Sequence, residues 1–385
     1  MLDDFGVDGG VPLRSTGVVW HELYLWHGNG ALGPPGSEHL AVEPGDFGEE
    51  TPHARRRLRN LLEVSGLLER LPALTPRPAS NEQLAAVHTA DYLARVREAS
   101  VHGDGWAGEV TPVGRGGFDF GALAAGGCVT AVDAVLGGTV ENAYALVRPA
   151  GHHALPDEGR GFCLFNNVAV AARHAQRGHG LKRVAVVDWD VHHGNGTQAV
   201  FWEDPDVLTV SLHQADWYPR GEGGVPERGA GAGAGRNVNV PLPPGSGIGA
   251  YRAAFDRVVL PALRAHSPEL IVVSCGLDAN AMDPSARMLL TSEDFRTLAE
   301  RVRSAADELC GGRLVLCHEG GYSPLYVPFC GLAVLEELCG LRSAIRDPFL
   351  ARYTGVGFEE LQDHQARVIE EVRRLVLEPA SSPTQ

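Results

Sequence analysis

The second half of the sequence alternates short apolar, β-branched runs with longer amphipathic segments. The apolar runs are too short for core helices and predict buried strands at Ala143–Val147, Arg183–Val187, Val207–Ser211, Leu270–Cys275 and Arg313–Cys317. The segments between them predict helices at Asn166–Arg177, Ile248–His266, Ser292–Leu309 and Pro324–Cys339. Strands that alternate with helices form a parallel sheet covered by helices on both faces. The pattern therefore predicts a three-layer α/β fold.

The N-terminal part of the chain carries weaker signals. We expect a short strand near Val18–Trp20 and helices at Pro52–Arg70, Asn81–Ala99 and Phe120–Leu136. The glycine-rich stretch 101–117 predicts a long loop that shapes a binding rim. No fixed-period repeat and no charged linker interrupts the chain, so we expect a single domain over residues 1–385. Its core is expected at about 18–376, with a disordered tail at 379–385.

Polar side chains follow the predicted strands at the points where the strands end. Asp188, Asp190 and His192 follow one strand, and their alternate spacing places them on one side of an extended chain. The other strand ends carry His152 and His153, His213, Asp278, and the segment His318–Tyr322. Ligands of open parallel sheets bind at the carboxyl ends of the strands. The sequence therefore predicts a functional site at this edge of the sheet.

The chemistry of these side chains indicates a metal-dependent hydrolase. Asp190, His192 and Asp278 offer oxygen and nitrogen ligands and leave a position open for water, which suits Zn²⁺; Fe²⁺ could bind the same set. The adjacent His152 and His153 suit proton transfer. Tyr322 follows two glycines and can bring its hydroxyl to a tetrahedral oxyanion. We interpret this set as an amide hydrolase that forms no covalent intermediate.

Composition narrows the choice of partners and compartment. The net charge of −15 argues against nucleic acid and is compatible with cationic substrates such as lysine-bearing tails or polyamines. The seven cysteines form no CxxC pair, which predicts reduced thiols. The first residues lack a signal-peptide pattern, and no run approaches 18 apolar residues. We therefore expect a cytoplasmic protein that has no membrane partner.

The motifs RPAGHHA, GFCLFNN, DWDVHHGNGTQ, GLDANAMDP and EGGY resemble the class II histone deacetylases, in particular the bacterial histone deacetylase-like amidohydrolases. The similarity extends from about Val18 to about Gly340, and the motifs occur in the order found in that family. It implies the arginase–deacetylase fold, which is one α/β domain around a mainly parallel sheet of about eight strands. It also implies a zinc-dependent deacetylase.

The resemblance implies a role for each matching residue. It makes Asp190, His192 and Asp278 the Zn²⁺ ligands, His153 the general base, and Tyr322 the donor that polarises the acetyl carbonyl. His152 becomes the electrostatic partner of His153 and is held by Asp188, while Asn195 orients His153. The residues expected to contact the substrate are the tunnel walls Phe162 and Tyr218, together with Gly161 and Gly320. The family also holds a structural K⁺, which implies contacts from Asp188, Asp190, His192, Ser211 and Leu212, several through backbone carbonyls. Family members are often dimers or tetramers, so a homo-oligomer is expected.

Three positions bear on the substrate and the metal. Asn280 stands where arginase-like relatives with two metals place a second carboxylate, which disfavours a dinuclear manganese site. Ser285 replaces the leucine usual in deacetylases and the glutamate that polyamine-specific members can carry. Tyr322 stands where some members have a histidine and turn over acetyl-lysine poorly. We interpret Asp283 as part of a turn at a helix start, with catalysis as the minor alternative, and His193 as structural.

We therefore expect a deacetylase that acts on N-acetylated amines, with acetyl-lysine side chains as the first choice of substrate. An acetylpolyamine deacetylase is the alternative within the same enzyme class. A non-hydrolysing acyl-lysine binding protein is the alternative from another class, and the complete ligand set, both histidines and Tyr322 disfavour it.

Overall fold

The computed structural model describes residues 6–7, 13–28, 50–103, 105–355, 357 and 359–377, and the predicted tail at 379–385 lies outside them. Eight strands of the described chain form one central sheet. They are β2 (Thr16–Val19), β3 (Ala73–Leu74), β6 (Asn142–Ala145), β7 (Val184–Asp188), β8 (Val207–Gln214), β9 (Asn237–Leu242), β10 (Leu270–Cys275) and β11 (Leu314–His318). Their order is β3-β2-β6-β11-β10-β7-β8-β9, and all neighbouring strands are parallel.

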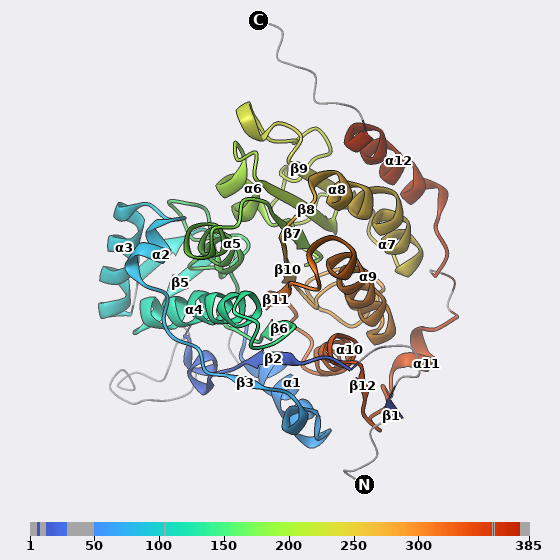
Figure 1. The fold of residues 1–385 in the computed structure, drawn as a ribbon, viewed down its shortest axis with the longest axis horizontal. Helices are drawn as coiled ribbons and strands as arrows, with labels where there is room; N and C mark the ends of the chain where they lie inside the picture. The colour runs from blue at the N-terminus through green and yellow to red at the C-terminus, as the bar shows by residue number, and fades with distance from the viewer. Residues whose placement is uncertain are drawn as a thin grey trace, which may run out of the picture.

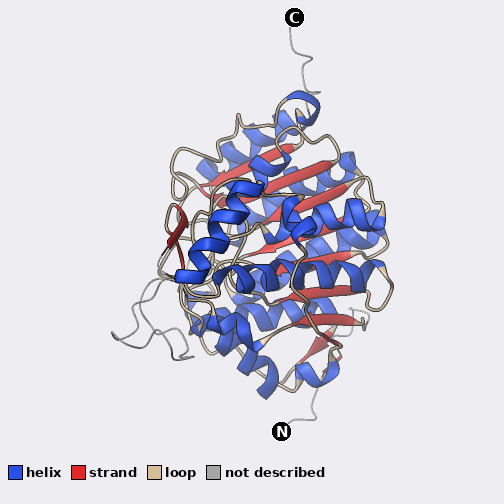
Figure 2. Ribbon diagram, turned by 90° about the vertical axis from the view of Figure 1, so that its left-hand side faces the viewer, coloured by secondary structure: helices blue, strands red, loops and turns tan. Residues whose placement is uncertain are grey.

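Helices cover both faces of this sheet (Figures 1 and 2). One face packs against α4 (Gly117–Leu136) and α5 (Asn167–His179). The opposite face carries α7 (Ile248–Ala254), α8 (Leu260–His266), α9 (Ser292–Cys310) and α10 (Val327–Cys339). The remaining helices are α1 (His53–Val64), α2 (Asn81–Ala85), α3 (Ala90–His102), α6 (Asn195–Phe201), α11 (Leu350–Tyr353) and α12 (Asp363–Leu377). Of these, α1 and α12 add buried side chains to the same core as α7 to α10. The predicted three-layer α/β architecture is confirmed.

The apolar runs are continuous because each central strand is buried on both faces. In β10, Leu270 and Val272 enter the core shared with α4 and α5, while Ile271, Val273 and Cys275 enter the core shared with α7 to α10. Helix α4 is the one helix of the described residues that is long and apolar enough to cross a membrane. Because 72% of its most apolar window is buried inside the protein, it serves as a core helix.

The strand order creates a switch point at the centre of the sheet. From β7 the chain moves outward to β8 and β9, and it then returns to β10 on the other side of β7. Neighbouring loops that leave in opposite directions open a crevice at the carboxyl ends of such strands. The polar segments after β7 and β10 therefore meet at this crevice.

Several predicted elements differ from those observed. The helix expected at Pro52–Arg70 ends at Val64, because Gly66 adopts a left-handed φ of 76° before the 3-10 turn η2 (Leu67–Arg70). The helix expected at Asn81–Ala99 is two helices, since Thr89 caps a new N-terminus. The glycine-rich loop 101–117 contains a hairpin of β4 (Gly105–Gly108) and β5 (Thr111–Val113).

Other elements were not predicted. They are β3, β9, α6, α11, α12, the 3-10 turns η1 (Glu22–Trp26) and η3 (Gly231–Gly233), and the antiparallel pair β1 (Gly6–Val7) and β12 (Leu341–Arg342). The helix expected at Ile248–His266 is present and contains a π turn, η4 (Phe255–Val259), between α7 and α8. All seven cysteines are buried and unpaired, as expected for reduced thiols.

Candidate active site

The segment after β7 is folded by its own carboxylates. Asp188 accepts a hydrogen bond from the backbone N–H of Asp190 at 3.0 Å, and Asp190 accepts one from the N–H of His192 at 2.9 Å. These contacts between residues two apart curl the chain and keep the three side chains at the mouth of the crevice. Asp188, Asp190 and His192 are all buried.

Three of the predicted residues converge as a ligand set. His192 Nδ1 lies 3.0 Å from Asp190 Oδ1 and 3.2 Å from Asp278 Oδ2. Asp278 Oδ1 accepts from the N–H of Val191 at 2.8 Å, whereas its Oδ2 is buried without a hydrogen-bond partner in the described structure. An orphaned carboxylate oxygen beside a second carboxylate and an imidazole nitrogen is a donor set that fits a divalent metal such as Zn²⁺.

The electrostatics of the ligand set reflect this crowding. Burial and the neighbouring Asp190 carboxylate raise the pKa of Asp278 to about 7. Burial also raises the pKa of Asp190, but the charges of His152 and His192 outweigh it and lower this pKa far below its ordinary value. Burial lowers the pKa of His192, yet the Asp190 and Asp278 carboxylates beside its Nδ1 raise it to about 10.

Asn280 does not contribute to this ligand set. Its side-chain amide donates to the backbone oxygen of Leu277 at 2.6 Å, and its Oδ1 accepts from the N–H of Met282 at 2.8 Å. Both ends of the amide are thus used to fold the loop after β10. This arrangement supports the expectation of a single metal.

The tandem histidines lie beside the ligand set with different partners. His152 Nδ1 contacts Asp188 Oδ2 at 2.9 Å, and His153 Nδ1 contacts Asn195 Oδ1 at 2.9 Å. The two rings are 4.0 Å apart between centroids. Because an oxygen of Asn195 faces His153 Nδ1, the proton of a neutral His153 resides on Nδ1 and Nε2 carries the free lone pair.

Their environments also push the two pKa values apart. Burial lowers the pKa of His152, but the carboxylates of Asp190 and Asp188 raise it well above its ordinary value. Burial and the charge of His152 lower the pKa of His153 well below its ordinary value. Adjacent groups with divergent pKa values suit an acid–base site that holds one neutral imidazole and one imidazolium.

Tyr322 reaches the site from the turn after β11. Its ring lies 6.2 Å from the His192 ring between centroids, and burial raises the pKa of its hydroxyl well above its ordinary value. The hydroxyl therefore stays protonated and can donate. Gly320 lies against the ligand carboxylates, since an added Cβ there would meet Asp278 Oδ2 at 2.1 Å. Only glycine fits this position.

Gly161 and Tyr218, two of the residues predicted to contact the substrate, lie beside His153. An added Cβ on Gly161 would meet the His153 ring at 2.6 Å and the Tyr218 ring at 2.9 Å, so Gly161 lies between these rings. The Tyr218 and His153 rings are 4.9 Å apart between centroids and nearly perpendicular. Phe162 follows with a left-handed φ of 67° and a half-buried side chain.

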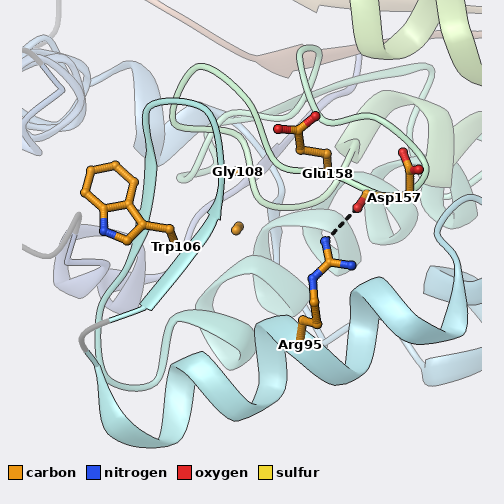
Figure 3. Close-up of a pocket in the computed structure, with 6 residues that line it drawn as sticks. Arg95, Trp106, Gly108, Asp157 and Glu158 are labelled. Carbon is orange, nitrogen blue, oxygen red and sulfur yellow. Dashed lines mark hydrogen bonds between the residues drawn. The ribbon is translucent and has the colours of Figure 1, made fainter.

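The β4–β5 hairpin supports this wall. Its carbonyl oxygens at Ala107, Glu109 and Val110 accept from the N–H groups of Gly159, Gly161 and Phe162 at 3.0 to 3.1 Å. A surface pocket of about 580 Å³ beside the hairpin is lined by Arg95, Trp106, Ala107, Gly108, Asp157 and Glu158 (Figure 3). Arg95 donates to the backbone oxygen of Asp157 there at 2.8 Å. The pocket contains none of the predicted site residues.

The residues expected to hold K⁺ lie on β7, β8 and the loop after β7. Ser211 pairs with Asp188 in the parallel register, and its hydroxyl contacts Nδ1 of His193 at 3.1 Å and Nδ1 of His213 at 2.9 Å. Leu212 is fully buried. A cavity of about 10 Å³ next to Asp188 and Ser211 has room for one small species. His193 therefore points away from the ligand set, as expected.

Sequence reasoning missed the role of Glu319. Its Oε2 accepts from the backbone N–H groups of Gly151 and His152 at 2.6 and 3.1 Å, which holds the chain that carries both histidines. Burial raises its pKa to about 7. The sequence feature that could have indicated this role is a carboxylate directly after a strand that is buried along its whole length. Gly276 was also missed; an added Cβ there would meet Asp190 Oδ2 at 2.2 Å.

A buried ion network also anchors the histidine loop. Arg148 is 1% exposed and donates to both carboxylate oxygens of Glu50 at 2.8 and 2.7 Å. Arg55 donates to Glu50 at 2.9 Å and to the backbone oxygen of Glu319 at 2.6 Å. Removing one member would leave a buried charge without its partner, which is strongly destabilising. Nothing in the sequence pattern indicates that these distant residues meet.

A second group of metal-ligating side chains lies between α4 and α5. Asp133 Oδ1 contacts Nε2 of His174 at 2.6 Å and Nε2 of His179 at 2.8 Å. Gln83 uses its oxygen to accept from Ser80 and Arg77, so its amide NH₂ faces Nδ1 of His174. His174 Nδ1 is therefore the acceptor, and Nε2 carries the proton directed at Asp133. This cluster is therefore held by hydrogen bonds. A metal bound to Nε2 of His174 would leave the ring proton on Nδ1, where it would face the NH₂ group of Gln83, so that two donors would point at each other.

The tautomer of His88 provides a pH-dependent prediction. His88 Nδ1 donates to the backbone oxygen of Leu155, and Nε2 accepts from the N–H of Asn166, both at 3.0 Å. Burial lowers its pKa to about 4, against 6.5 in the unfolded chain. Its contribution to stability is therefore complete above pH 6.5 and is lost as the pH falls through 4.

We expect wild type to lose roughly 2 to 3 kcal/mol more unfolding free energy between pH 7 and 4.5 than His88→Gln loses. Urea denaturation of both proteins at the two pH values measures this difference. Equal losses would show that His88 does not titrate in this way.

A family model described as the histone deacetylase domain matches residues 49–338. The chain is 51% identical to a histone deacetylase-like amidohydrolase of Pseudomonas aeruginosa over 337 residues, 87% of this chain and 89% of that protein. It is 40% identical to the human polyamine deacetylase HDAC10 over 293 residues, 71% of this chain and 42% of that protein. The crystal structure of the HDA15 HD domain matches with a TM-score of 0.82 and 32% identity, covering 94% of this chain and 95% of that one.

The parallel sheet, with an Asp-His-Asp group that could hold a metal at its switch point, defines an α/β protein with a candidate metal site. Within that class the chain belongs to the histone deacetylase family and is an enzyme of the deacetylase and amidohydrolase type. The predicted family and the predicted arginase–deacetylase fold, with its single α/β domain and eight-stranded parallel sheet, are confirmed.

Proposed function

We propose that this protein is a Zn²⁺-dependent deacetylase that releases acetate from N-acetylated primary amines, with acetyl-lysine side chains as the preferred class. The observation that carries the proposal is the meeting of the Asp190, His192 and Asp278 ligand atoms with the two histidines and Tyr322 at one crevice. A reader that binds acyl-lysine without hydrolysis has no need of the complete set, and the family to which the chain belongs is enzymatic.

Asp190, His192 and Asp278 would hold the metal. A bound Zn²⁺ supplies a water of lowered pKa and polarises the substrate carbonyl. His153 would take a proton on Nε2, since Asn195 occupies its Nδ1, and would later return the proton to the leaving amine. His152, held by Asp188, would contribute positive charge beside it. Tyr322 would donate its hydroxyl to the carbonyl oxygen as negative charge develops there.

We assign substrate contacts to Phe162, Tyr218, Gly161 and Gly320, and a structural K⁺ to Asp188, Asp190, His192, Ser211 and Leu212. The position of Gly161 between the His153 and Tyr218 rings supports the first assignment. The small cavity beside Asp188 and Ser211 supports the second. The homo-oligomeric state and the cytoplasmic location stay predictions from the sequence.

An acetylpolyamine deacetylase is the second candidate. The resemblance to a human protein named as a polyamine deacetylase favours it, as does the net charge of −15. Ser285 lacks both the carboxylate that polyamine-specific members can carry at that position and the leucine usual in deacetylases, so this position favours neither candidate. The two candidates share the chemistry of the site and differ in what surrounds the acetylated amine.

A parallel turnover assay tests this proposal. The zinc-loaded protein is given a fluorogenic acetyl-lysine peptide or acetylputrescine, each with and without a chelator. We expect chelator-sensitive cleavage of both, with a higher kcat/KM for the peptide. A higher kcat/KM for acetylputrescine would select the polyamine candidate. Cleavage that a chelator leaves unchanged, or measurable binding without any cleavage, would contradict the proposed mechanism.

A further inference from the structure

The turn that presents Tyr322 has little stiffness of its own. It contains Gly320 and Gly321, and Gly321 adopts a φ of 132°, a backbone conformation that L side chains rarely adopt. Glycine gives a turn many accessible conformations, so the position of the next side chain depends on contacts that hold the backbone. Contacts with the rest of the protein must therefore fix the position of Tyr322.

Two carboxylates hold this turn at alternate backbone N–H groups. Asp190 Oδ2 accepts from the N–H of Gly320 at 2.8 Å, and Asp283 Oδ2 accepts from the N–H of Tyr322 at 2.8 Å. Gly321 lies between the two anchors. Asp190 belongs to the ligand set, whereas Asp283 lies five residues after Asp278 and was predicted as a turn at a helix start, with a catalytic role as the minor alternative. No helix begins there, because α9 starts at Ser292.

Asp283 is itself held rigidly. It is 7% exposed, and its Oδ1 accepts from both the N–H and the hydroxyl of Ser285 at 3.0 and 2.6 Å. The Asn280 amide lies 3.3 Å from its Oδ2. A buried carboxylate with both oxygens occupied has lost its rotational freedom, and hydrogen bonds to a charged acceptor are stronger than neutral ones. The N–H of Tyr322 is therefore tied to a fixed point.

We propose that Asp283 is a positioning residue that sets the location of the Tyr322 hydroxyl through this single backbone hydrogen bond. The inference rests on the proposed function, in which Tyr322 donates to the substrate carbonyl. Asp283 touches neither substrate nor metal; it acts by fixing the backbone from which Tyr322 projects.

The same contacts explain Ser285. Its hydroxyl turns inward to Asp283, and its backbone oxygen accepts from the Trp217 indole N–H at 2.5 Å. A leucine at this position could not supply the hydroxyl bond. Ser285 thus links three loops, those after β8, β10 and β11, and serves to hold Asp283 instead of contacting the substrate as a rim side chain.

A double-mutant cycle on the zinc-loaded, full-length protein tests the inference. Asp283→Ala, Tyr322→Phe and the double variant are compared with wild type for kcat and KM on the acetyl-lysine peptide, with zinc content measured in each. Because a displacement of about 1 Å can cost on the order of 10²-fold in rate, we expect Asp283→Ala to lower kcat by at least about 10-fold. KM should change by less than about threefold, and zinc should stay stoichiometric. In the Tyr322→Phe background, Asp283→Ala should lower kcat by no more than about twofold, since there is then no hydroxyl to misplace.

Asp283→Asn and Asp294→Ala complete the design. Asn keeps an oxygen for the Tyr322 N–H, so Asp283→Asn should restore most of the lost kcat. Ser285→Ala, which removes a donor that holds Asp283, takes the place of the alanine variant in the cycle if that variant does not fold. Asp294 makes the same kind of bonds, with the N–H and hydroxyl of Thr291 at 2.8 Å, but it caps α9 and does not contact the turn. Asp294→Ala should lower the melting temperature and leave kcat within about twofold of wild type.

Equal kcat losses from Asp283→Ala in both backgrounds would overturn the inference, because a general structural effect does not need the Tyr322 hydroxyl. Unchanged kcat in Asp283→Ala would also overturn it. The Tyr322→Phe single variant tests the proposed function separately, because a wild-type kcat in that variant would remove Tyr322 from the mechanism.

Discussion

Asp190→Ala is expected to lose stoichiometric zinc and to lower deacetylation by at least about 10³-fold. The substitution removes Oδ1, which lies 3.0 Å from His192 Nδ1, and also the acceptor for the N–H of Gly320. Two ligands would then remain, and a catalytic zinc site takes three protein ligands to hold its metal and activate water. Zinc content per chain after gel filtration, together with kcat/KM on the acetyl-lysine peptide, measures both effects.

Asp133→Ala is the matched control, because Asp133 forms the other cluster of one carboxylate and two histidines in the described structure. Its histidine His174 already carries a proton on Nε2, so this variant should keep one zinc per chain and wild-type kcat/KM. Zinc retained in Asp190→Ala would remove Asp190 from the ligand set. Zinc lost in Asp133→Ala would show that the metal binds between α4 and α5.

His153→Ala is expected to lower kcat by about 10²- to 10⁴-fold while zinc stays stoichiometric. The variant removes the Nε2 lone pair that we assign to proton transfer, and positioned general bases contribute rate factors of this size. His153 contacts Asn195 through Nδ1 and is not among the ligand atoms, so metal binding should survive. Steady-state kinetics and zinc analysis of the same preparation measure the two quantities.

Asn195→Ala tests whether the orientation of His153 matters. It removes the acceptor that holds the Nδ1 proton but leaves the imidazole, so its loss in kcat should be smaller than that of His153→Ala. A His153→Ala protein with full zinc and a kcat near wild type would rule out His153 as the base. A larger loss in Asn195→Ala than in His153→Ala would point to a structural role for Asn195.

The organisation of the site depends on which contacts are local. The segment from Asp188 to His192 folds upon itself, because each carboxylate accepts from the backbone two residues later. A motif of this kind carries its geometry in its own sequence. Glu319 and Arg148 act differently, since each makes its main contacts with residues far along the chain. Asp283 combines local contacts with Ser285 and one distant contact with the N–H of Tyr322.

The sequence determined the parallel α/β sheet, the central strands and the residues of the Asp-His-Asp set. Long apolar β-branched runs can be buried only as central strands, and their carboxyl ends must share one edge. The family motifs then assigned His152, His153 and Tyr322 to one centre, and the structure places all three there. Short edge strands such as Ala73–Leu74 and the helix at Asp363–Leu377 were missed. The edge strand is too short to carry a period, and the helix was not recognised from its pattern.

Only the tertiary structure decided how these residues are held. The Tyr322 backbone is fixed by Asp283, the His152 backbone by Glu319, and His192 Nδ1 lies opposite Asp278 Oδ2 across two strands. These contacts join segments separated by 39 to 167 residues. Hydrogen bonds across such separations depend on which strands are neighbours, and strand order leaves no periodic trace in the sequence. The sequence therefore indicates the chemistry of the site, whereas the fold determines how the side chains of the site are aligned.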